Sequence, residues 1–411
     1  MNRVEIMDYL STNTKSECFG CEACAQICPK SAISILEDQE GFRYPRINTE
    51  LCINCGLCHK ICPANNIPEV SKEKKYAYGG HHKSKNVRRR STSGGAFTAV
   101  AQAWCDENYV VYGAASKGLE VFHYGIDDIK KLAVICKSKY SQSRIGNTFS
   151  KIKDDLKSGK KVLFSGTPCQ VAGLKAFLQN TDTTNLLLVE VICEGVPTPH
   201  YIRKLDDHIF SKYGSRIKKL DYRSKGYKKS IQSFKWDFQK MALELENGII
   251  LEKDRWFNPY WSIWLDHLMS RPSCYSCPFA TTERQADISL GDLWGVHIYC
   301  PELYGGNGGA SLIICNTEKG KKVWQAAQKN FCGHELDFDT ALKYQGPMRK
   351  TIDKNPRREQ CMHDLADENM SYKSICDKWA KKPSLKLLFQ KYIWGNRQKV
   401  FCWNVLHNIK K

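Results

Sequence analysis

The chain has 411 residues, of which 42% are hydrophobic and 26% are charged, so it can form two or three domains around at least one sizeable core, and wholesale disorder is excluded. No apolar run reaches the about 18 residues of a membrane-spanning helix, and residues 1–16 lack the apolar core of a secretory signal. We therefore expect a cytoplasmic protein, whose 20 cysteines bind metal or stay reduced instead of forming disulfides.

The formal net charge is +19. A [4Fe-4S] core held by four thiolates adds two negative charges, so two such clusters would lower the total to about +15 and a third to about +13. The protein stays basic in either case, which favours acidic partners: an anionic membrane surface, a phosphate-bearing cofactor or an acidic redox protein. No nucleic-acid recognition motif is present, so we expect no nucleic acid among the partners.

The N-terminal segment contains one cysteine motif twice. The first copy has the spacing C-x2-C-x2-C-x3-C-P and consists of Cys18, Cys21, Cys24, Cys28 and Pro29. The second copy has the same spacing 34 residues later and consists of Cys52, Cys55, Cys58, Cys62 and Pro63. This is the run of bacterial ferredoxins with two [4Fe-4S] clusters, in which the fourth cysteine of each copy binds the other cluster.

The spacing also assigns ligands to clusters. Three cysteines two residues apart wrap one cluster, while the fourth opens a helical turn and points to the other. The first cluster is therefore expected to be bound by Cys18, Cys21, Cys24 and Cys62. The second is expected to be bound by Cys28, Cys52, Cys55 and Cys58. Zinc, the main alternative beside disulfides, needs only four ligands per site and does not require this doubled run.

Apolar residues between the two copies predict a β-hairpin that covers the clusters. They alternate on either side of Glu40-Gly41 and are Ile33, Ile35, Phe42, Tyr44 and Ile47. Residues 66–75, with Pro68 and a Lys/Glu run, are expected to form a linker. Beyond it, strands are predicted at 162–164, 186–192, 286–290 and 310–315, and helices at 97–104 and 171–178. This alternation predicts an α/β (α+β) fold with a mixed sheet.

Two turns of this region suit ligand binding. The small residues 91–96 open a predicted helix and follow Arg88–Arg90, so their N–H groups favour an anion such as a cofactor phosphate. An ordinary helix cap beside a solvated basic face is the alternative. The strand at 162–164 leads through Ser165-Gly-Thr-Pro-Cys-Gln170 into a helix, and α/β domains place ligands at such turns.

Cys274-x2-Cys277 is a lone C-x2-C pair. By itself it fits half a zinc site or a redox pair. Together with Cys169 and Cys193, each of which follows a predicted strand, it could complete a third [4Fe-4S] site. The remaining scattered cysteines are expected to be small buried apolar residues.

Five segments occur in an order that resembles the coenzyme F-420 hydrogenase/dehydrogenase beta-subunit family, in its version with a fused N-terminal ferredoxin. They are Ser93-Gly-Gly-Ala-Phe97, Lys139-Tyr-Ser-Gln-Ser143, Phe164-Ser-Gly-Thr-Pro-Cys-Gln170, Ile192-Cys-Glu-Gly-Val-Pro197 and Asp287-Ile-Ser-Leu-Gly-Asp-Leu-Trp-Gly295. The resemblance covers roughly residues 15–340. It implies a bound flavin, usually FAD, and an additional [4Fe-4S] cluster in the larger domain.

The resemblance also implies site residues. It places the following at the flavin: Ser93, Gly94, Gly95, Lys139, Tyr140, Gln142 and Ser143. Lys139 is the candidate catalytic residue, which would stabilise charge near the flavin or the substrate. The family's core-domain cysteine positions correspond to Cys169, Cys193, Cys274 and Cys277. The domains expected on this basis are a 2[4Fe-4S] ferredoxin-type domain at 1–68, a flavin-binding domain at 76–340 and a helical basic extension at 341–411.

The expected function is that of an iron–sulfur flavoprotein oxidoreductase. Electrons from a redox partner such as ferredoxin would pass through the clusters to the flavin, which reduces, or in reverse oxidises, a small organic substrate or a deazaflavin. The motifs do not set the direction of flow. One alternative is a non-catalytic subunit that delivers electrons to a separate catalytic partner. Another is a polyferredoxin fused to a binding module without flavin.

The C-terminal extension lies outside the resemblance. From Tyr372 onward it contains ten Lys/Arg and one acidic residue, Asp377, interleaved with large apolar residues. A basic amphipathic stretch of this kind can lie on a membrane surface or dock an acidic partner. We expect instead that its helices pack back on the core and leave a solvated basic face.

Overall fold

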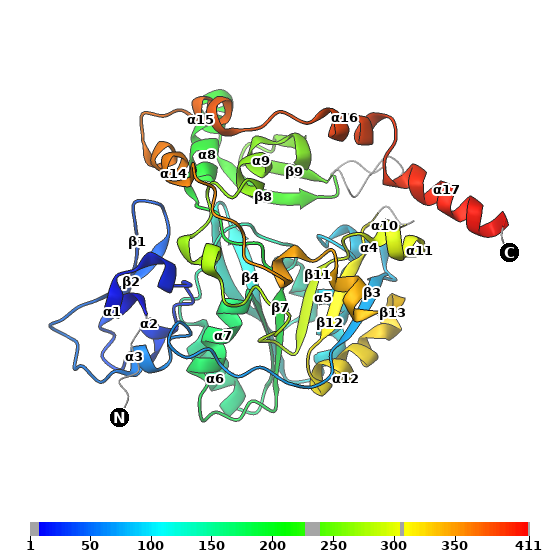
Figure 1. Ribbon diagram of the computed structural model, residues 1–411. Helices are drawn as coiled ribbons and strands as arrows, with labels where there is room; N and C mark the ends of the chain where they lie inside the picture. The colour runs from blue at the N-terminus through cyan, green and yellow to red at the C-terminus, as the bar shows by residue number, and fades with distance from the viewer. Residues whose placement is uncertain (1–7, 227–238, 305–307, 410–411) are drawn as a thin grey trace.

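The computed structural model describes residues 8–226, 239–304 and 308–409. The ferredoxin module, residues 8–66, forms one end of the molecule (Figure 1). Its hairpin pairs β1 (Ile33–Glu37) with β2 (Arg43–Ile47), antiparallel, as the apolar alternation predicted. Its helical turns are α1 (Tyr9–Thr12), η1 (Lys15–Glu17), α2 (Ala23–Ile27) and α3 (Leu57–Lys60). Residues 66–75, the predicted linker, contain neither helix nor strand.

The centre of the molecule is an eight-stranded mixed sheet in the order β13-β3-β12-β11-β7-β6-β4-β5. Its strands are β3 (Tyr76–His82), β4 (Tyr109–Lys117), β5 (Glu120–Ile126), β6 (Lys161–Gly166), β7 (Leu186–Val191), β11 (Ile288–Asp292), β12 (Ser311–Cys315) and β13 (Phe331–Leu336). Strands β4, β6, β7 and β11 run parallel to one another. Strands β12, β3, β13 and β5 each pair in antiparallel fashion with their neighbours. The predicted mixed α/β fold is confirmed.

Helices cover both faces of this sheet. Helices α5 (Ala96–Trp104) and α12 (Glu318–Ala327) pack on the face that carries Leu163 and Leu187. On the other face, α6 (Thr148–Lys157) and α7 (Pro168–Phe177) pack against Val162, Phe164 and Leu188. Because both faces are buried, the central strands are apolar at successive positions. This pattern allowed β6, β7, β11 and β12 to be predicted from the sequence, whereas β4 was not predicted.

A smaller antiparallel sheet lies beside the large one and consists of β8 (Ile217–Ser224), β9 (Lys240–Leu245) and β10 (Ile250–Asp254). Its core also contains α8 (His200–Tyr213), α9 (Pro259–Leu265), α14 (Arg358–Ala366) and α15 (Tyr372–Trp379). Phe42 and Tyr44 of the ferredoxin hairpin belong to the same apolar cluster. The ferredoxin module is therefore packed into the fold and is not a tethered appendage.

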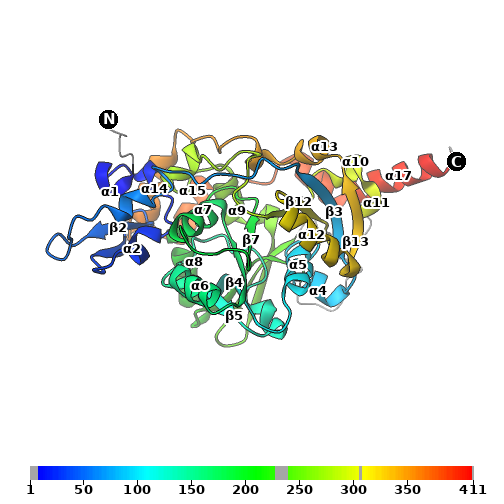
Figure 2. The same ribbon diagram turned by 90° about the horizontal axis from the view of Figure 1, so that it is seen from below.

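The remaining elements are short. They are α4 (Lys85–Arg89), η2 (Ile129–Val134), η5 (Arg255–Phe257), η6 (Pro272–Ser276), α10 (Val296–Tyr299), α11 (Pro301–Tyr304), η7 (Gln328–Asn330), α13 (Phe338–Leu342) and η8 (Gly346–Met348). The last two helices are α16 (Leu385–Tyr392), which lies beside the smaller sheet and whose Lys391 pairs with Asp254 of β10 (Figure 1), and α17 (Asn396–Ile409), which projects from the body at the end opposite the ferredoxin module (Figures 1 and 2). Within the described ranges, no helix has the length and apolar character needed to cross a membrane.

The expectation that the tail packs back on the core is correct for its first half only. Ile375 and Trp379 of α15 are buried in the core of the smaller sheet. In α16 and α17, by contrast, large apolar side chains such as Leu385 and Phe401 are exposed. The free amphipathic face therefore begins after α15.

Candidate functional site

The cysteines of the ferredoxin module gather around two small cavities. One cavity, of about 130 Å³, is lined by the four cysteines that the spacing assigns to the second cluster: Cys28, Cys52, Cys55 and Cys58. The other, of about 30 Å³, is lined by the four assigned to the first cluster: Cys18, Cys21, Cys24 and Cys62. Cys58 lines both cavities, so the two sites are adjacent.

The chemistry of these thiols suits a positively charged iron core. Burial, together with nearby Asp8 and Cys18, raises the pKa of Cys62 to about 12. Burial and the neighbouring thiols also raise the pKa values of Cys21 and Cys24 well above the usual range. Buried thiols that oppose one another's ionisation become good ligands only when a cation stabilises their thiolates. The donor set therefore fits [4Fe-4S] clusters at both positions.

Hydrogen bonds fix the first-cluster loop to the large domain. The Glu22 carboxylate accepts hydrogen bonds from the backbone N–H groups of Ile145 and Gly146, at 3.1 and 2.8 Å. The Gln26 side-chain oxygen accepts from the N–H groups of Phe149 and Ser150, at 3.0 and 3.2 Å. These last two N–H groups lie in the first turn of α6, where they have no partner within the helix. The module thus caps a helix of the large domain.

Helix α7 brings a third group of cysteines next to the first cluster. A Cβ atom added at Gly173 would lie 2.8 Å from Cβ of Cys21, so the cluster-one loop rests directly on this helix. Cys169 lies one helical turn before Gly173 on α7. The first-cluster site and Cys169 are therefore close neighbours.

Cys169 shares its surroundings with Cys193, Cys274 and Cys277. Burial raises the pKa of Cys193 well above its usual range, with further contributions from Cys274, Cys169 and Cys277. Burial likewise raises the pKa of Cys169 to about 11 and that of Cys274 to about 12. The donor chemistry of these four partly buried thiols fits a further iron–sulfur cluster, as the family resemblance implies.

A cavity of about 560 Å³ adjoins this third group and has the size of a typical cofactor site. It lies at the carboxyl ends of β6, β7 and β11, where open α/β sheets bind ligands. Six of the seven residues predicted at the flavin line it: Ser93, Gly95, Lys139, Tyr140, Gln142 and Ser143. Cys169 and Cys193 line it as well.

Gly94 is the exception among the predicted cavity residues. It is absent from the cavity wall, and its N–H donates to Ser311 Oγ at 2.9 Å. A Cβ at this position would lie 2.4 Å from the carbonyl oxygen of Gly80. Gly94 therefore allows the turn before α5 to lie against β3 and β12, behind the residues that face the cavity.

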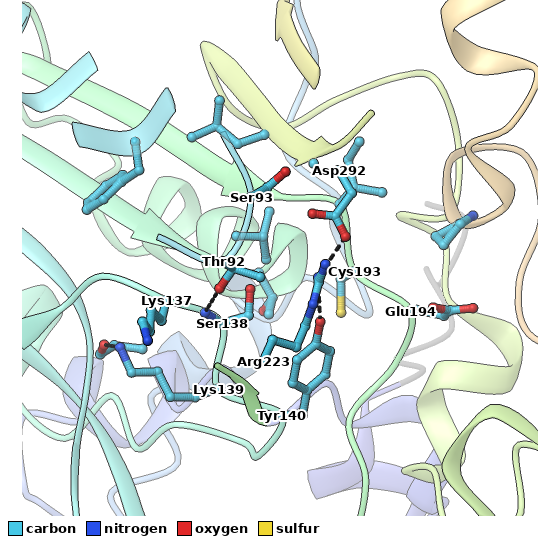
Figure 3. Close-up of a pocket in the computed structure, with 18 of the residues that line it drawn as sticks. Thr92, Ser93, Lys137, Ser138, Lys139, Tyr140, Cys193, Glu194, Arg223 and Asp292 are labelled. Carbon is cyan, nitrogen blue, oxygen red and sulfur yellow. Dashed lines mark hydrogen bonds and ion pairs between the residues drawn. The ribbon is translucent and has the colours of Figure 1, made fainter. Parts of the chain in front are cut away.

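The cavity wall carries buried positive charge. Arg223 forms an ion pair with Asp292 at 2.7 Å and donates to the Tyr140 hydroxyl at 3.1 Å (Figure 3). The Arg255 guanidinium stacks on Trp256 and Trp261, with its central carbon 4.6 and 4.3 Å from the ring centroids.

Arg255 has unused binding capacity. It is 6% exposed, and its Nε atom has no hydrogen-bond partner. Burial lowers its pKa to about 10, which still leaves the guanidinium protonated at neutral pH. The cavity therefore offers a buried cation to an anionic group.

Two ionisable groups in the cavity have pKa values shifted toward neutrality. Lys139 donates from Nζ to the carbonyl oxygens of Ala114 and Cys136, each at 2.6 Å, and burial lowers its pKa to about 8. Burial raises the pKa of Glu194, although Arg255 opposes this shift. Groups with pKa values displaced toward neutrality can hold or release a proton at working pH.

His123 is fixed as a neutral ring at the cavity wall. Its Nε2 lies 3.1 Å from the Ser165 carbonyl oxygen, so this nitrogen must carry the hydrogen, and Nδ1 accepts from Ser143 Oγ at 3.0 Å. Gln170 donates to the same Ser143 oxygen at 2.9 Å. Burial lowers the pKa of His123 to about 4, which agrees with a ring that stays uncharged.

The sequence analysis did not identify five polar residues of the cavity: His123, Glu194, Arg223, Arg255 and Asp292. Glu194 and Asp292 lie inside segments that carried the family resemblance, so a signal was present. Arg223 and Arg255 belong to β8 and η5, and no motif marks them. Elsewhere, ligand atoms of Cys300, Glu302 and His334 lie within 4.8 Å of one another, with Cys300 alone buried.

Two protein-family models match segments of this chain. Residues 159–338 match the family described as the C terminus of the coenzyme F420 hydrogenase/dehydrogenase beta subunit, and residues 17–66 match the 4Fe-4S dicluster domain. A solved chain from the F420-reducing [NiFe] hydrogenase complex of Methanosarcina barkeri is 16% identical, with 76% of this chain and 92% of that chain covered and a TM-score of 0.41. No curated protein gave a significant match. The chain is therefore an iron–sulfur electron-transfer protein that joins a 4Fe-4S dicluster domain to the C-terminal domain of the coenzyme F420 hydrogenase/dehydrogenase beta-subunit family.

Proposed function

We propose that this protein is a flavin-dependent oxidoreductase of the reducing cytoplasm, in which three [4Fe-4S] clusters connect an external one-electron carrier to a flavin. The observation that carries the proposal is an unbroken series of cysteine sites. Cys58 joins the two ferredoxin sites, Cys21 packs on α7 one turn from Cys169, and Cys169 lines the large cavity. Electrons can move along such a series one at a time.

The same series supports an entry point for electrons. Cys55, at the second-cluster site, is exposed, whereas Cys21, at the first, is buried. The second cluster therefore lies at the surface, where a soluble carrier such as a ferredoxin can approach. The first cluster lies between it and the large domain.

The large cavity supports FAD as the flavin. Its volume of about 560 Å³ suits a cofactor, and Arg255 offers an unpaired buried nitrogen to a phosphate group. The backbone at Gly95, with φ of +93°, opens α5 at the cavity wall, so the first N–H groups of this helix can bind an anion. A bound flavin would supply the exchange between one-electron transfer and hydride transfer.

Lys139 and Glu194 are the proposed proton-handling residues. Lys139, with a pKa of about 8, can stabilise negative charge in its protonated form and release the proton near neutrality. Hydrogen bonds to Ser165 and Ser143 hold His123 neutral. We therefore propose that its role is to position Ser143 and Gln170 in the cavity wall.

The test starts from protein purified without oxygen. We expect heat denaturation to release FAD, and iron analysis to give about 12 atoms per chain. In the variant Cys274→Ser/Cys277→Ser, iron should fall to about 8 while the dicluster electron paramagnetic resonance signal of the reduced protein remains. Flavin-free protein with full iron content would overturn the flavin assignment, and iron near 8 in both proteins would overturn the third cluster.

A second candidate is an electron-transfer subunit without its own substrate, which is favoured because the matched family is named for a beta subunit. The two candidates differ in one measurement. The isolated chain, reduced by a viologen dye, should reoxidise on addition of a deazaflavin or another organic acceptor if it is an enzyme. If it is a subunit, reoxidation requires the catalytic partner.

A further inference from the structure

The last two helices carry apolar side chains that nothing in the described chain covers. Their exposed large apolar residues, with exposed fractions of 40–84%, are Leu385, Phe389, Tyr392, Ile393, Trp394, Phe401, Val405 and Leu406. Water is an unfavourable environment for a contiguous apolar surface of this kind, and such surfaces mark interaction sites. The neighbouring helix α15 buries its own apolar residues, Ile375 and Trp379.

The exposed residues form helical faces. In α16, Leu385, Phe389 and Tyr392 are spaced i, i+4, i+7 and therefore share one side of the helix. In α17, Phe401 and Val405 have the same i, i+4 relation. Helix α17 contacts α10 and α11, and its Val400 is buried, so the helix is held to the body on one side and presents apolar residues on another.

The charge of the segment is of one sign. Between Lys378 and the end of the chain the sequence contains no Asp or Glu. Lys382, Lys386 and Lys399 are exposed beside the apolar faces. A second copy of this chain would bring like charges together, which disfavours self-association through these helices. The complementary surface is negatively charged and has an apolar layer beneath the charge.

We infer that α16 and α17 bind the surface of an anionic phospholipid bilayer and lie in the plane of its headgroups. Exposed Tyr, Trp, Phe and Leu would insert below the headgroups, and the lysines would contact lipid phosphates, as in interfacial amphipathic helices. Helix α17 is about 21 Å long and too short to cross the hydrocarbon layer of about 30 Å, so it lies on the membrane.

The position of the helices suits this role. Helix α17 projects from the body at the end opposite the ferredoxin module (Figures 1 and 2), and α16 precedes it beside the smaller sheet (Figure 1). The exposed second-cluster site at Cys55 therefore stays away from the lipid and open to a soluble carrier. The inference itself stands on the tail alone and does not depend on the proposed flavin or third cluster.

The experiment is flotation of the full-length protein with lipid vesicles. The two vesicle types are phosphatidylcholine alone and phosphatidylcholine with about 30% phosphatidylglycerol, at about 0.1 M salt. We expect binding to the anionic vesicles and a decrease when salt is raised to about 0.5 M, because salt screens the lysines. Replacing Lys386 and Lys399 by Gln should weaken anionic binding about 30-fold, since each lysine near such a surface contributes about fivefold.

The apolar contribution has its own variant. Leu385→Ser/Phe389→Ser/Tyr392→Ser should reduce binding at least about tenfold. The matched control removes similarly exposed apolar side chains elsewhere, Val134→Ser/Phe210→Ser, and should leave binding unchanged. Iron content and melting temperature check that each variant folds.

Three outcomes overturn the inference. The first is a wild-type protein that binds neither vesicle type. The second is equal binding to both types without salt dependence, which removes the role of the lysines. The third is a protein that binds no lipid but forms a dimer, or a complex with an acidic protein, and loses that complex in the apolar triple variant. The tail would then be a protein interface.

Discussion

Replacement of Arg271 should change the reduction potential of the first cluster and that of the proposed third cluster. This side chain is 1% exposed and lies between the ferredoxin module and the large domain. It donates from Nε to the Cys18 carbonyl oxygen at 2.9 Å, from one terminal nitrogen to the Gln142 side-chain oxygen at 2.9 Å and from the other to the Arg43 carbonyl oxygen at 3.0 Å. It also stacks on Tyr44, at 4.3 Å from the ring centroid.

The charge of Arg271 acts on both neighbouring cluster sites. Burial lowers its pKa, but Cys18, Tyr44 and Cys274 outweigh burial, and the pKa is raised. For an illustrative separation of about 8 Å and an effective dielectric constant of about 20, a guanidinium charge stabilises one electron added to a cluster by about 2 kcal/mol. For a one-electron couple this corresponds to about 90 mV. Loss of the charge should therefore make the potential of the first cluster, and that of the proposed third cluster, about 90 mV more negative.

Three variants separate charge from structure. Arg271→Met removes the charge and leaves three buried acceptors unpaired, so both the potentials and the melting temperature should fall. Arg271→Lys keeps the charge but not the three-way hydrogen bonding, so mainly stability should fall. Arg358→Met breaks the partly buried ion pair with Glu40, which joins the ferredoxin module to α14, and should lower stability while the potentials stay unchanged.

The assay is an anaerobic redox titration followed by electron paramagnetic resonance, which resolves individual clusters. The reasoning is refuted if Arg271→Met shifts no potential by more than about 20 mV, or if Arg358→Met produces the same shift. In the second case the shift would come from loosened packing and increased solvent access instead of a lost charge.

Three further changes test other contacts of the fold. Gly173→Val would place side-chain atoms where a Cβ would lie 2.8 Å from Cβ of Cys21, so iron content and melting temperature should both fall. The control Gly159→Ala lies at an exposed turn with open space but with φ of +79°, so it should lower the melting temperature and leave iron content unchanged. Lys139 has a pKa of about 8 in the native state and of about 10.4 in the unfolded state. Between these pH values the unfolded state binds more protons, so the free energy of unfolding rises with pH. Urea unfolding should show that the free energy of unfolding of the wild type, relative to that of Lys139→Met, rises by about 3 kcal/mol between pH 8 and pH 10.4. A difference that stays constant over this range would contradict this. His123 has a pKa of about 4 in the native state and of about 6.5 in the unfolded state. The free energy of unfolding of the wild type, relative to that of His123→Gln, should therefore fall by about 3 kcal/mol between pH 6.5 and pH 4. Parallel pH profiles of the two proteins would show that burial does not keep the ring neutral.

The cluster region could be predicted from the sequence because its information is local. A fixed spacing of four cysteines determines which thiols can reach one cluster, and the structure groups Cys28 with Cys52 and Cys62 with Cys18 around the two cavities, as the crossover requires. The central strands were also predictable, since helices on both faces require apolar residues at successive positions. Strands β3, β4, β5 and β13 of the large sheet were not predicted. Exposure weakens the apolar pattern of β13, whereas β3 is mostly buried but is interrupted by Gly79 and Gly80.

The cavity needed the three-dimensional structure because its charges come from different layers of the fold. Lys139 follows the large sheet's β5 in the chain, whereas Arg223 and Arg255 come from the smaller sheet and the turn after it. Arg223 reaches Asp292 at the end of β11 across this junction. Neither sheet alone forms an electropositive cavity. A motif can mark the glycine turns of one sheet, but the cations that would hold an anionic cofactor appear only when the second sheet packs against the first. The smaller sheet is therefore as much a part of the site as the segments that carry the family resemblance, and substitutions at Arg255 should weaken cofactor binding even though no motif marks it.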